Sequence, residues 1–414
     1  MQKIFAQYRR WFVLTGLMMI YATSSGIIVH TLPLLYPSLI DEFGWSRAQM
    51  TLPATVFFIF GAITSPPAGV LFDRFSVRRI MLVGVIGLII SLMCLPLISA
   101  LWQLVTVYLV FGLSLSLCGL TASMVILTKW FHEKRGRATG LLLMSSSLGG
   151  AIFPLILGAG IEALGWRGAI AFVSIMAVCM TLPALIFLII DRPATSTLNI
   201  NLETNLSRKS LIKKGPTLRA AIQTPTFYLI AIATGSIWVA IIALTQHQSL
   251  HLVKDVGVDA TLLPKVFSVF FACSVVGKFS FGWLSDYLNK EFSMIISIII
   301  LGGGLLIIRS LDADDRVMLF AYAVLGGIGF SGAFTTIQLL IAQHFAGDSY
   351  GKILALIVMI DSLAGGIGTR VIAKMRDGSD SYTAGWDVLI ALCVVAIVCT
   401  FIIRQLNYST IKGN

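Results

Sequence analysis

Long apolar stretches separated by short polar breaks run along almost the whole chain. A transmembrane α-helix needs about 20 predominantly apolar residues to cross the hydrocarbon core of a bilayer, and twelve stretches approach or exceed that length. They cover residues 11–39, 49–72, 79–99, 102–127, 138–162, 168–190, 224–250, 261–284, 292–309, 317–341, 352–373 and 385–403. The pattern predicts an all-α integral membrane protein with twelve transmembrane helices, surrounded by a lipid bilayer.

One polar segment is much longer than the other breaks. It extends from Asp191 to Pro225 and is rich in Lys and Arg, a composition typical of a cytoplasmic linker. We therefore predict three parts. These are an N-terminal six-helix bundle at residues 1–190, a cytoplasmic linker at 191–223 and a C-terminal six-helix bundle at 224–414.

Composition and charge agree with a membrane protein and indicate its orientation. Hydrophobic residues make up 57% of the 414 residues and charged residues 12%, about half of the ~25% that is usual in soluble domains. Of the 30 Lys and Arg residues, 20 lie in segments on the side of the linker and 7 in segments on the opposite side. Because positive residues gather on the cytoplasmic side, we expect a multi-pass protein of the cell inner membrane with cytoplasmic N- and C-termini.

The net charge of +11 therefore reflects the excess of Lys and Arg on the cytoplasmic side of the membrane. No nucleic-acid-binding motif accompanies it, so we expect no nucleic-acid partner. The first apolar run is too long for a cleavable signal peptide, and we expect it to stay in the membrane.

The two sets of six helices share an internal repeat. The matching pairs are Gly69 and Gly282, Leu71 and Leu284, Asp73 and Asp286, Phe131 and Phe345, and Gly136 and Gly351. The offset stays between 213 and 215 residues in separate parts of the chain. Repeated halves are typical of secondary transporters, so the sequence predicts two homologous bundles.

A motif between the second and third predicted helices resembles the signature of the major facilitator superfamily. It reads Gly69-x-Leu71-x-Asp73-Arg74-x-Ser76-x-Arg78-Arg79, with Ser76 where the superfamily usually has glycine. The resemblance implies the major facilitator fold, close helix packing at the glycine and an ion-pair cluster that locks the two halves together in one state. It assigns conformational gating to Gly69, Asp73, Arg74, Arg78, Arg79 and Asp286. The alternative is that the arginines are ordinary positive-inside anchors.

Shorter matches resemble one branch of that superfamily, the monocarboxylate porters and oxalate/formate antiporters. They are Trp11, the segment EFGWSR that begins at Glu42, the segment KWFHEKRGRATG that begins at Lys129, and a basic residue four positions before Gly282. The resemblance implies a carboxylate as the transported substrate.

The branch also suggests which residues bind that substrate. Lys278 matches a helix-8 arginine that is implicated in holding the substrate carboxylate, and His30 matches a helix-1 lysine of some members if one gap is allowed. Ser274 stands where animal monocarboxylate porters have an aspartate. Their proton-coupling pair is therefore not carried over to this chain.

Two charges deep in predicted helices indicate a functional site without any resemblance. A charged side chain near the bilayer centre costs roughly 2.5–3.5 kcal/mol, so one that persists faces a partner or a water-filled cavity. Lys278 can hold a carboxylate through one or two hydrogen bonds. Asp361, in the middle of the eleventh helix, can carry a coupled proton or neutralise Lys278 until substrate displaces it. The alternatives are a lysine that snorkels to the inner interface and a structural salt bridge between the two residues.

Several polar residues near the ends of predicted helices are further candidates for substrate binding. His30 lies in the outer half of the first helix and is able to titrate near neutral pH. His247 and Gln246 lie near the outer end of the seventh helix, and Tyr36 is placed to line a cavity. Packing roles and an interfacial polar cap are the alternatives for these residues.

The sequence offers no signal for an enzyme. It lacks a GxxxxGK[ST] phosphate loop, an HExxH motif and a nucleophile elbow, so we predict no catalytic residues and no direct use of ATP. The six cysteines lack metal-site spacing, and no cofactor or metal is expected beyond the proton gradient as driving force.

These observations predict a secondary active transporter that works by alternating access. We expect a monomer that moves a small organic anion, similar to a monocarboxylate, together with a proton. One alternative is transport of a larger or amphiphilic compound such as a siderophore or a drug. Another is a membrane sensor on the same scaffold, which usually adds a soluble output domain, whereas only about eleven residues follow the last predicted helix.

Overall fold

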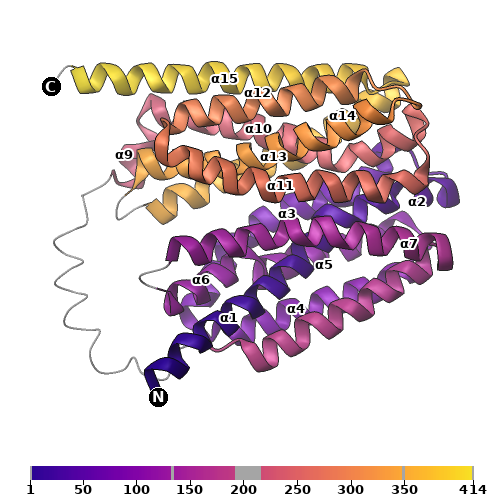
Figure 1. Ribbon diagram of the computed structural model, residues 1–414, viewed down its shortest axis with the longest axis horizontal. Helices are drawn as coiled ribbons and strands as arrows, with labels where there is room; N and C mark the ends of the chain where they lie inside the picture. The colour runs from indigo at the N-terminus through magenta and orange to yellow at the C-terminus, as the bar shows by residue number, and fades with distance from the viewer. Residues whose placement is uncertain (1, 132–134, 192–215, 347–349, 413–414) are drawn as a thin grey trace.

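The protein is described by a computed structural model that is helical throughout its described parts (Figure 1). The structure describes the backbone of residues 2–131, 135–191, 216–346 and 350–412. Within these ranges it describes all side chains except those of residues 2–7, 73, 135–136 and 407–412.

The helices of the N-terminal half follow the predicted apolar stretches. They are α1 (Gln2–Ser25), a wide turn (Gly26–Thr31) and a 3-10 turn (Leu32–Leu35), α2 (Tyr36–Phe43), α3 (Arg47–Arg74), α4 (Val77–Cys94) with a 3-10 turn (Leu95–Leu97), α5 (Leu101–Cys118), α6 (Leu120–Trp130) and α7 (Arg135–Pro183) with a wide turn (Ala184–Leu188).

The C-terminal half begins after the linker. Its helices are α9 (Leu218–Ile222), α10 (Pro225–Leu250) with a wide turn (His251–Val256), a 3-10 turn (Ala260–Leu262), α11 (Leu263–Tyr287), α12 (Lys290–Arg309), α13 (Arg316–Phe345), α14 (Tyr350–Ser379) and α15 (Thr383–Lys412).

The prediction of twelve transmembrane helices is confirmed. Eleven helical stretches of the described chain are long and apolar enough to cross a bilayer, and the longest, Arg137–Leu188, has 52 residues. This stretch contains two spans that meet at Gly165, where φ is 69°. Glycine adopts that left-handed backbone without steric cost, so the chain reverses there between the predicted helices 138–162 and 168–190.

Two proline residues interrupt the first transmembrane span. Pro33 and Pro37 cannot donate a backbone hydrogen bond, and the helix widens over Gly26–Thr31 before it tightens over Leu32–Leu35. The Thr31 hydroxyl donates to the Gly26 carbonyl at 2.7 Å. Such wide turns are frequent at functional sites, and this one contains His30.

The two halves meet along two equivalent seams. In one seam α7 packs against α11, and in the other α3 packs against α14. The repeat offset of 213–215 residues relates α3 to α11 and the first part of α7 to α14, so it exchanges one seam with the other. The internal repeat of the sequence is thus visible as paired helix contacts.

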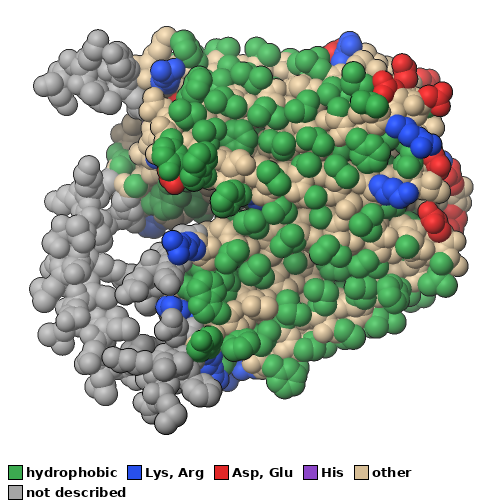
Figure 2. Space-filling view, viewed as in Figure 1, with side chains coloured by type: hydrophobic (Ala, Val, Ile, Leu, Met, Phe, Trp, Pro, Cys, Tyr) green, Lys and Arg blue, Asp and Glu red, His purple; other side chains and the backbone are tan. Residues whose placement is uncertain are grey.

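The surface agrees with a bilayer environment. Figure 2 shows apolar side chains over the middle of the molecule, with basic and acidic side chains gathered at the two ends. We name these ends by position. The linker end carries Asp191 and Leu218, and the distal end, on the right of Figure 1, carries the turns at Gly44 and Gly257.

Candidate functional site

Lys278 of α11 lies at the seam between the two halves. Its amine donates to the Leu143 carbonyl at 2.9 Å and to the Ser146 hydroxyl at 3.1 Å, both on α7. One turn earlier on α11, Ser274 shares a hydrogen bond of 3.0 Å with Ser147. The lysine therefore contacts the opposite half directly.

An aromatic surface surrounds this lysine. The Lys278 amine lies 5.4 Å from the centre of the Phe334 ring on α13, within the range of a cation–π contact. The Phe334 ring is 5.9 Å from that of Trp238 on α10, whose buried indole N–H has no acceptor among the described residues. The indole lies one ring beyond Phe334 from the lysine, and its unpaired N–H is able to donate to an anionic group.

His30 contacts a second group of aromatic side chains, on α11 and α13, from the N-terminal half. Its ring centre is 4.2 Å from that of Phe271 and 6.2 Å from that of Phe330. The Nδ1 atom is buried and has no partner in the described part of the chain. Gly150 permits this approach, because a Cβ at that position would lie 2.7 Å from Phe271 and 3.0 Å from His30.

Asp361 of α14 is fully buried against α10. Its Oδ1 atom accepts a hydrogen bond of 2.7 Å from Thr234, while Oδ2 has no partner among the described residues. Thr234 lies four positions before Trp238, so the two side chains share one face of α10. Asp361 is thus connected through α10 to the aromatic surface beside Lys278.

The suggested ion pair between Lys278 and Asp361 is not present in this conformation. Each residue has the separate partners given above, and no salt bridge between them occurs in the described structure. Lys278 is turned toward α7 across the seam between the halves, and Asp361 is turned toward α10 within the C-terminal half. The alternative of a structural salt bridge between these helices is therefore wrong for this state.

Tyr36 and Gln246 meet across the two halves nearer the distal end. The Tyr36 hydroxyl donates to the Gln246 side-chain oxygen at 2.7 Å, and both residues are buried. They close the space between α2 and α10 on the distal side of His30.

His247 does not face this cluster. Its Nδ1 lies 2.9 Å from the Tyr382 hydroxyl and its Nε2 lies 2.9 Å from the Thr369 carbonyl, all within the C-terminal half. Both ring nitrogens are therefore occupied by the protein, as in the packing alternative.

Replacement of His247 by alanine is expected to destabilise the protein without changing its substrate affinity. The change leaves the buried Tyr382 hydroxyl without its partner, at a cost of about 1–3 kcal/mol, and removes the side-chain donor to the Thr369 carbonyl. Thermal unfolding in detergent should show a lower midpoint, whereas the Kd of the remaining folded protein stays at the wild-type value. A weaker Kd at unchanged stability would contradict this structural role.

Charged residues join the two halves at the distal end, in a group that we call the distal latch. The backbone N–H groups of Arg47 and Ala48, at the start of α3, donate to Asp377 of α14 at 3.1 and 2.9 Å. Asp255 pairs with Arg47 at 3.7 Å and with Arg376 at 2.5 Å. Further cross-half contacts link Lys254 with Asp41, and Arg370 with the Ala48 carbonyl.

Removal of Asp377 is expected to open the distal end. Its carboxylate binds two free amides at the positive end of a helix, and hydrogen bonds to a charged group contribute about 1.5–3 kcal/mol. Asp377→Ala should therefore increase maleimide labelling of a cysteine at buried Thr55 about tenfold, in a background without the native cysteines. Asp380→Ala is the matched control, because the Asp380 side chain is 98% exposed. Equal labelling of the two variants would argue against the latch.

The Glu42 segment has a structural role within the N-terminal half. Glu42 accepts a hydrogen bond of 2.6 Å from the Trp166 indole N–H and one of 2.8 Å from Arg167. The Arg167 guanidinium stacks over Trp166 at 4.3 Å. These contacts tie α2 to the turn at Gly165.

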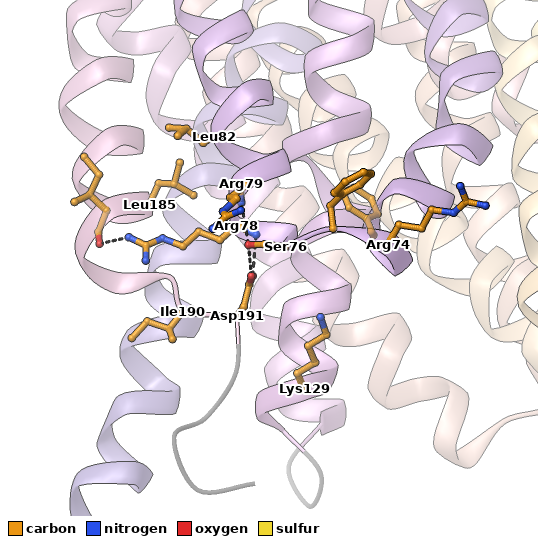
Figure 3. A pocket seen from close by; sticks show the side chains of 12 residues that line it. Arg74, Ser76, Arg78, Arg79, Leu82, Lys129, Leu185, Ile190 and Asp191 are labelled. Carbon is orange, nitrogen blue, oxygen red and sulfur yellow. Dashed lines mark hydrogen bonds between the residues drawn. The ribbon is translucent and has the colours of Figure 1, made fainter. Parts of the chain in front are cut away.

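The loop between α3 and α4 is organised around Asp191. This carboxylate accepts hydrogen bonds from the Ser76 hydroxyl and, at 2.8 Å, from the backbone N–H of Arg78. The Arg78 guanidinium donates to the Ile186 carbonyl at 2.7 Å. Figure 3 shows Arg78, Ser76 and Asp191 drawn together, with Arg74 directed away from them.

The expected gating cluster differs from this arrangement at Gly69 and at Asp286. The Asp73 side chain lies outside the described residues, so its predicted contacts are not described. A Cβ at Gly69 would meet no atom within 4 Å, so the close packing expected there is absent because the linker end of α3 is not pressed against another helix. Asp286 is exposed and has no ion-pair partner in the described structure.

Sequence reasoning missed the acidic members of both charged groups. Asp191 was counted as the first residue of the linker, and Asp41, Asp255 and Asp377 were not singled out. The available signal was the occurrence of both charge signs in very short distal loops, which also contain Arg47, Lys254 and Arg376.

Comparison with known proteins agrees with the fold. The family model of the Major Facilitator Superfamily matches residues 13–369 and 226–413. A crystal structure of a bacterial homologue of the human lysosomal transporter Spinster superposes with a TM-score of 0.75 at 16% identity over 97% of each chain.

Curated sequences cover most of the chain at low identity. An uncharacterised transporter of this superfamily from Bacillus subtilis (strain 168), YcxA, is 21% identical over 96% of this chain and 95% of its own. Monocarboxylate transporter 13 of Rattus norvegicus is 24% identical over 87% of this chain and 81% of its own. Because the family model spans nearly the whole chain and the structure has two equivalent six-helix halves, this protein belongs to the Major Facilitator Superfamily and is a membrane transporter.

Proposed function

We propose that this transporter moves a small organic anion, similar to a monocarboxylate, together with a proton. The observation that carries the proposal is the position of Lys278 at the seam between the halves. Its amine has three N–H donors, of which two are bound to α7. The third is available to a substrate carboxylate, and the free Trp238 indole N–H can supply a further donor.

The location of Lys278 also links substrate binding to conformational change. A carboxylate that competes for the amine weakens the contact of α11 with Leu143 and Ser146. Binding energy is thereby used to alter the seam between the halves, which is the differential interaction that alternating access requires.

Asp361 is our candidate for the proton site. It is buried, and its second oxygen has no donor, so a proton there would remove an uncompensated charge. Uptake of an anion against an inside-negative potential costs about 2.3 kcal/mol per charge per 100 mV. A proton carried with the anion cancels that cost.

We further propose that the linker end faces the cytoplasm. The excess of Lys and Arg on that side supports this orientation. The name of monocarboxylate transporter 13 refers to an anionic cargo, which supports the substrate class.

Uptake into proteoliposomes tests the proposal. A panel of radiolabelled monocarboxylates, dicarboxylates and neutral analogues is offered with and without an inward proton gradient. We expect uptake of at least one monocarboxylate, an increase with the gradient and no uptake of its amide. Uptake of the neutral amide at the rate of the acid would refute the anion class.

The second candidate is a larger amphiphilic compound such as a siderophore or a drug. The aromatic side chains of Phe271 and Phe330 beside His30, and of Phe334 and Trp238 near Lys278, favour it, because such surfaces also bind apolar molecules. A thermal-shift panel separates the two, since an amphiphile should stabilise the protein at micromolar concentration and short carboxylates should not.

A further inference from the structure

We propose that a groove at the linker end of the N-terminal half binds the headgroup of an anionic phospholipid. The groove has a volume of about 880 Å³ and is formed by the α3–α4 loop, the end of α6 and the residues that follow α7. That size is within the range of small-molecule sites, which is about 300–1,000 Å³. The site is separate from the seam that contains Lys278 and does not depend on the cargo.

The charge of the groove fits a phosphate group. Its lining contains four basic residues, Arg74, Arg78, Arg79 and Lys129, and one acidic residue, Asp191. Both Asp191 oxygens are bound, one to the Ser76 hydroxyl and one to the Arg78 backbone N–H. The carboxylate therefore organises the loop and does not pair with the side chains of Arg79 or Lys129.

Two of these cations are free to bind a ligand. The side chains of Arg79 and Lys129 have no hydrogen-bond or ion-pair partner in the part of the chain that the structure describes. The Arg78 guanidinium is held by the Ile186 carbonyl at 2.7 Å, and Arg74 points to the other side of the loop (Figure 3). The phosphate should thus lie between Arg79 and Lys129.

The apolar part of the groove distinguishes a lipid from a soluble phosphate. Leu82 and Ile186 line it and are 38% and 52% exposed. They lie just inside the ends of transmembrane segments, where basic side chains and lipid headgroups share the same depth. An acyl chain can cover these side chains while its phosphate reaches the cations.

Native mass spectrometry of the detergent-purified protein tests the site. The probes are phosphatidylglycerol and zwitterionic phosphatidylcholine with the same acyl chains. Each Lys or Arg near an anionic lipid surface changes binding about fivefold. We therefore expect Arg79→Gln combined with Lys129→Gln to weaken phosphatidylglycerol binding roughly 25-fold and to leave phosphatidylcholine binding unchanged.

Lys290→Gln is the matched control. Lys290 begins α12, which is the counterpart of α4 in the second half, and it does not line this groove. The double variant Arg79→Lys with Lys129→Arg keeps both charges and should bind like the wild type, which separates loss of charge from misfolding.

Three results would overturn the proposal. The first is unchanged phosphatidylglycerol binding in the charge-removing double variant, and the second is an equal loss in Lys290→Gln. The third is displacement of bound phosphatidylglycerol by millimolar glycerol phosphate or inorganic phosphate, which would identify a soluble phosphate as the ligand.

Discussion

Replacement of Lys278 by alanine is expected to lower carboxylate uptake into proteoliposomes at least a hundredfold. The alanine variant loses the positive charge at the seam and both hydrogen bonds to α7. In the proposed complex Lys278 pairs with the substrate carboxylate; loss of one partner from a buried charge pair costs about 3–5 kcal/mol, and a factor of ten corresponds to about 1.4 kcal/mol. A hundredfold effect is therefore a modest estimate.

Two control variants test whether the loss of uptake in Lys278→Ala results from weaker substrate binding. Lys278→Arg keeps the charge and should retain more than a tenth of the activity, although its planar fork differs in geometry. Ser274→Ala, one turn away on α11, removes another cross-half hydrogen bond, that to Ser147. We expect it to change uptake less than threefold.

One result from these variants would contradict a substrate-binding role for Lys278. If Lys278 only ties α11 to α7, then Ser274→Ala should reduce uptake as strongly as Lys278→Ala. Uptake measured at several substrate concentrations adds a second criterion, because loss of the substrate-binding cation should raise the KM, whereas loss of a simple tie should not.

The transmembrane architecture was predictable because it depends on local properties of the chain. Each span is an apolar run long enough to cross the bilayer, and in lipid the backbone must form helices to satisfy its own hydrogen bonds. Even the reversal at Gly165 falls between two predicted helices. The internal repeat likewise predicted two equivalent halves, which the two seams confirm.

The partners of the buried charges were not predictable, because they depend on how the helices are rotated and on the conformational state. The sequence shows that Lys278 and Asp361 lie deep in helices, and a pair between them was a reasonable hypothesis. The structure turns Lys278 to the Leu143 carbonyl and Asp361 to Thr234. A backbone carbonyl and a threonine hydroxyl carry no charge signal that a sequence pattern can detect.

The partners in the distal latch were also not predictable from the sequence, because they lie far apart along the chain. Asp377 binds amides of Arg47 and Ala48 that are about 330 residues away in sequence. The acceptor is a side chain but the donors are backbone groups, so neither charge pairing nor residue type indicates the contact. Only the packing of α3 against α14 brings the start of one helix to the end of the other.

Replacement of Asp361 by asparagine is expected to abolish proton-driven accumulation and to preserve exchange. Asparagine has the same shape and keeps an oxygen for the Thr234 hydroxyl, which donates to Asp361 at 2.7 Å. It cannot bind or release a proton in the transport cycle. An electroneutral symporter in a gradient of one pH unit accumulates its anion about tenfold, which corresponds to about 1.4 kcal/mol. The variant should reach an accumulation ratio of one.

Exchange between preloaded vesicles provides the control within the same protein. Exchange requires only the loaded carrier to change conformation, so the rate for Asp361→Asn should stay within about threefold of the wild type. Thr234→Val removes the hydroxyl partner of Asp361 but leaves the carboxyl group. It should keep accumulation and move the pH profile of uptake, which a purely structural contact would not do.

Equal loss of accumulation and exchange in Asp361→Asn would exclude the coupling role. Such a result would show that the residue supports packing of α14 against α10, since Gly365 and Gly368 also approach α10 closely there. Retained proton-driven accumulation in Asp361→Asn would also exclude the coupling role, because the proton would then travel through another group. The separation of the two measured processes, and not the loss of activity by itself, identifies Asp361 as the residue that carries the proton.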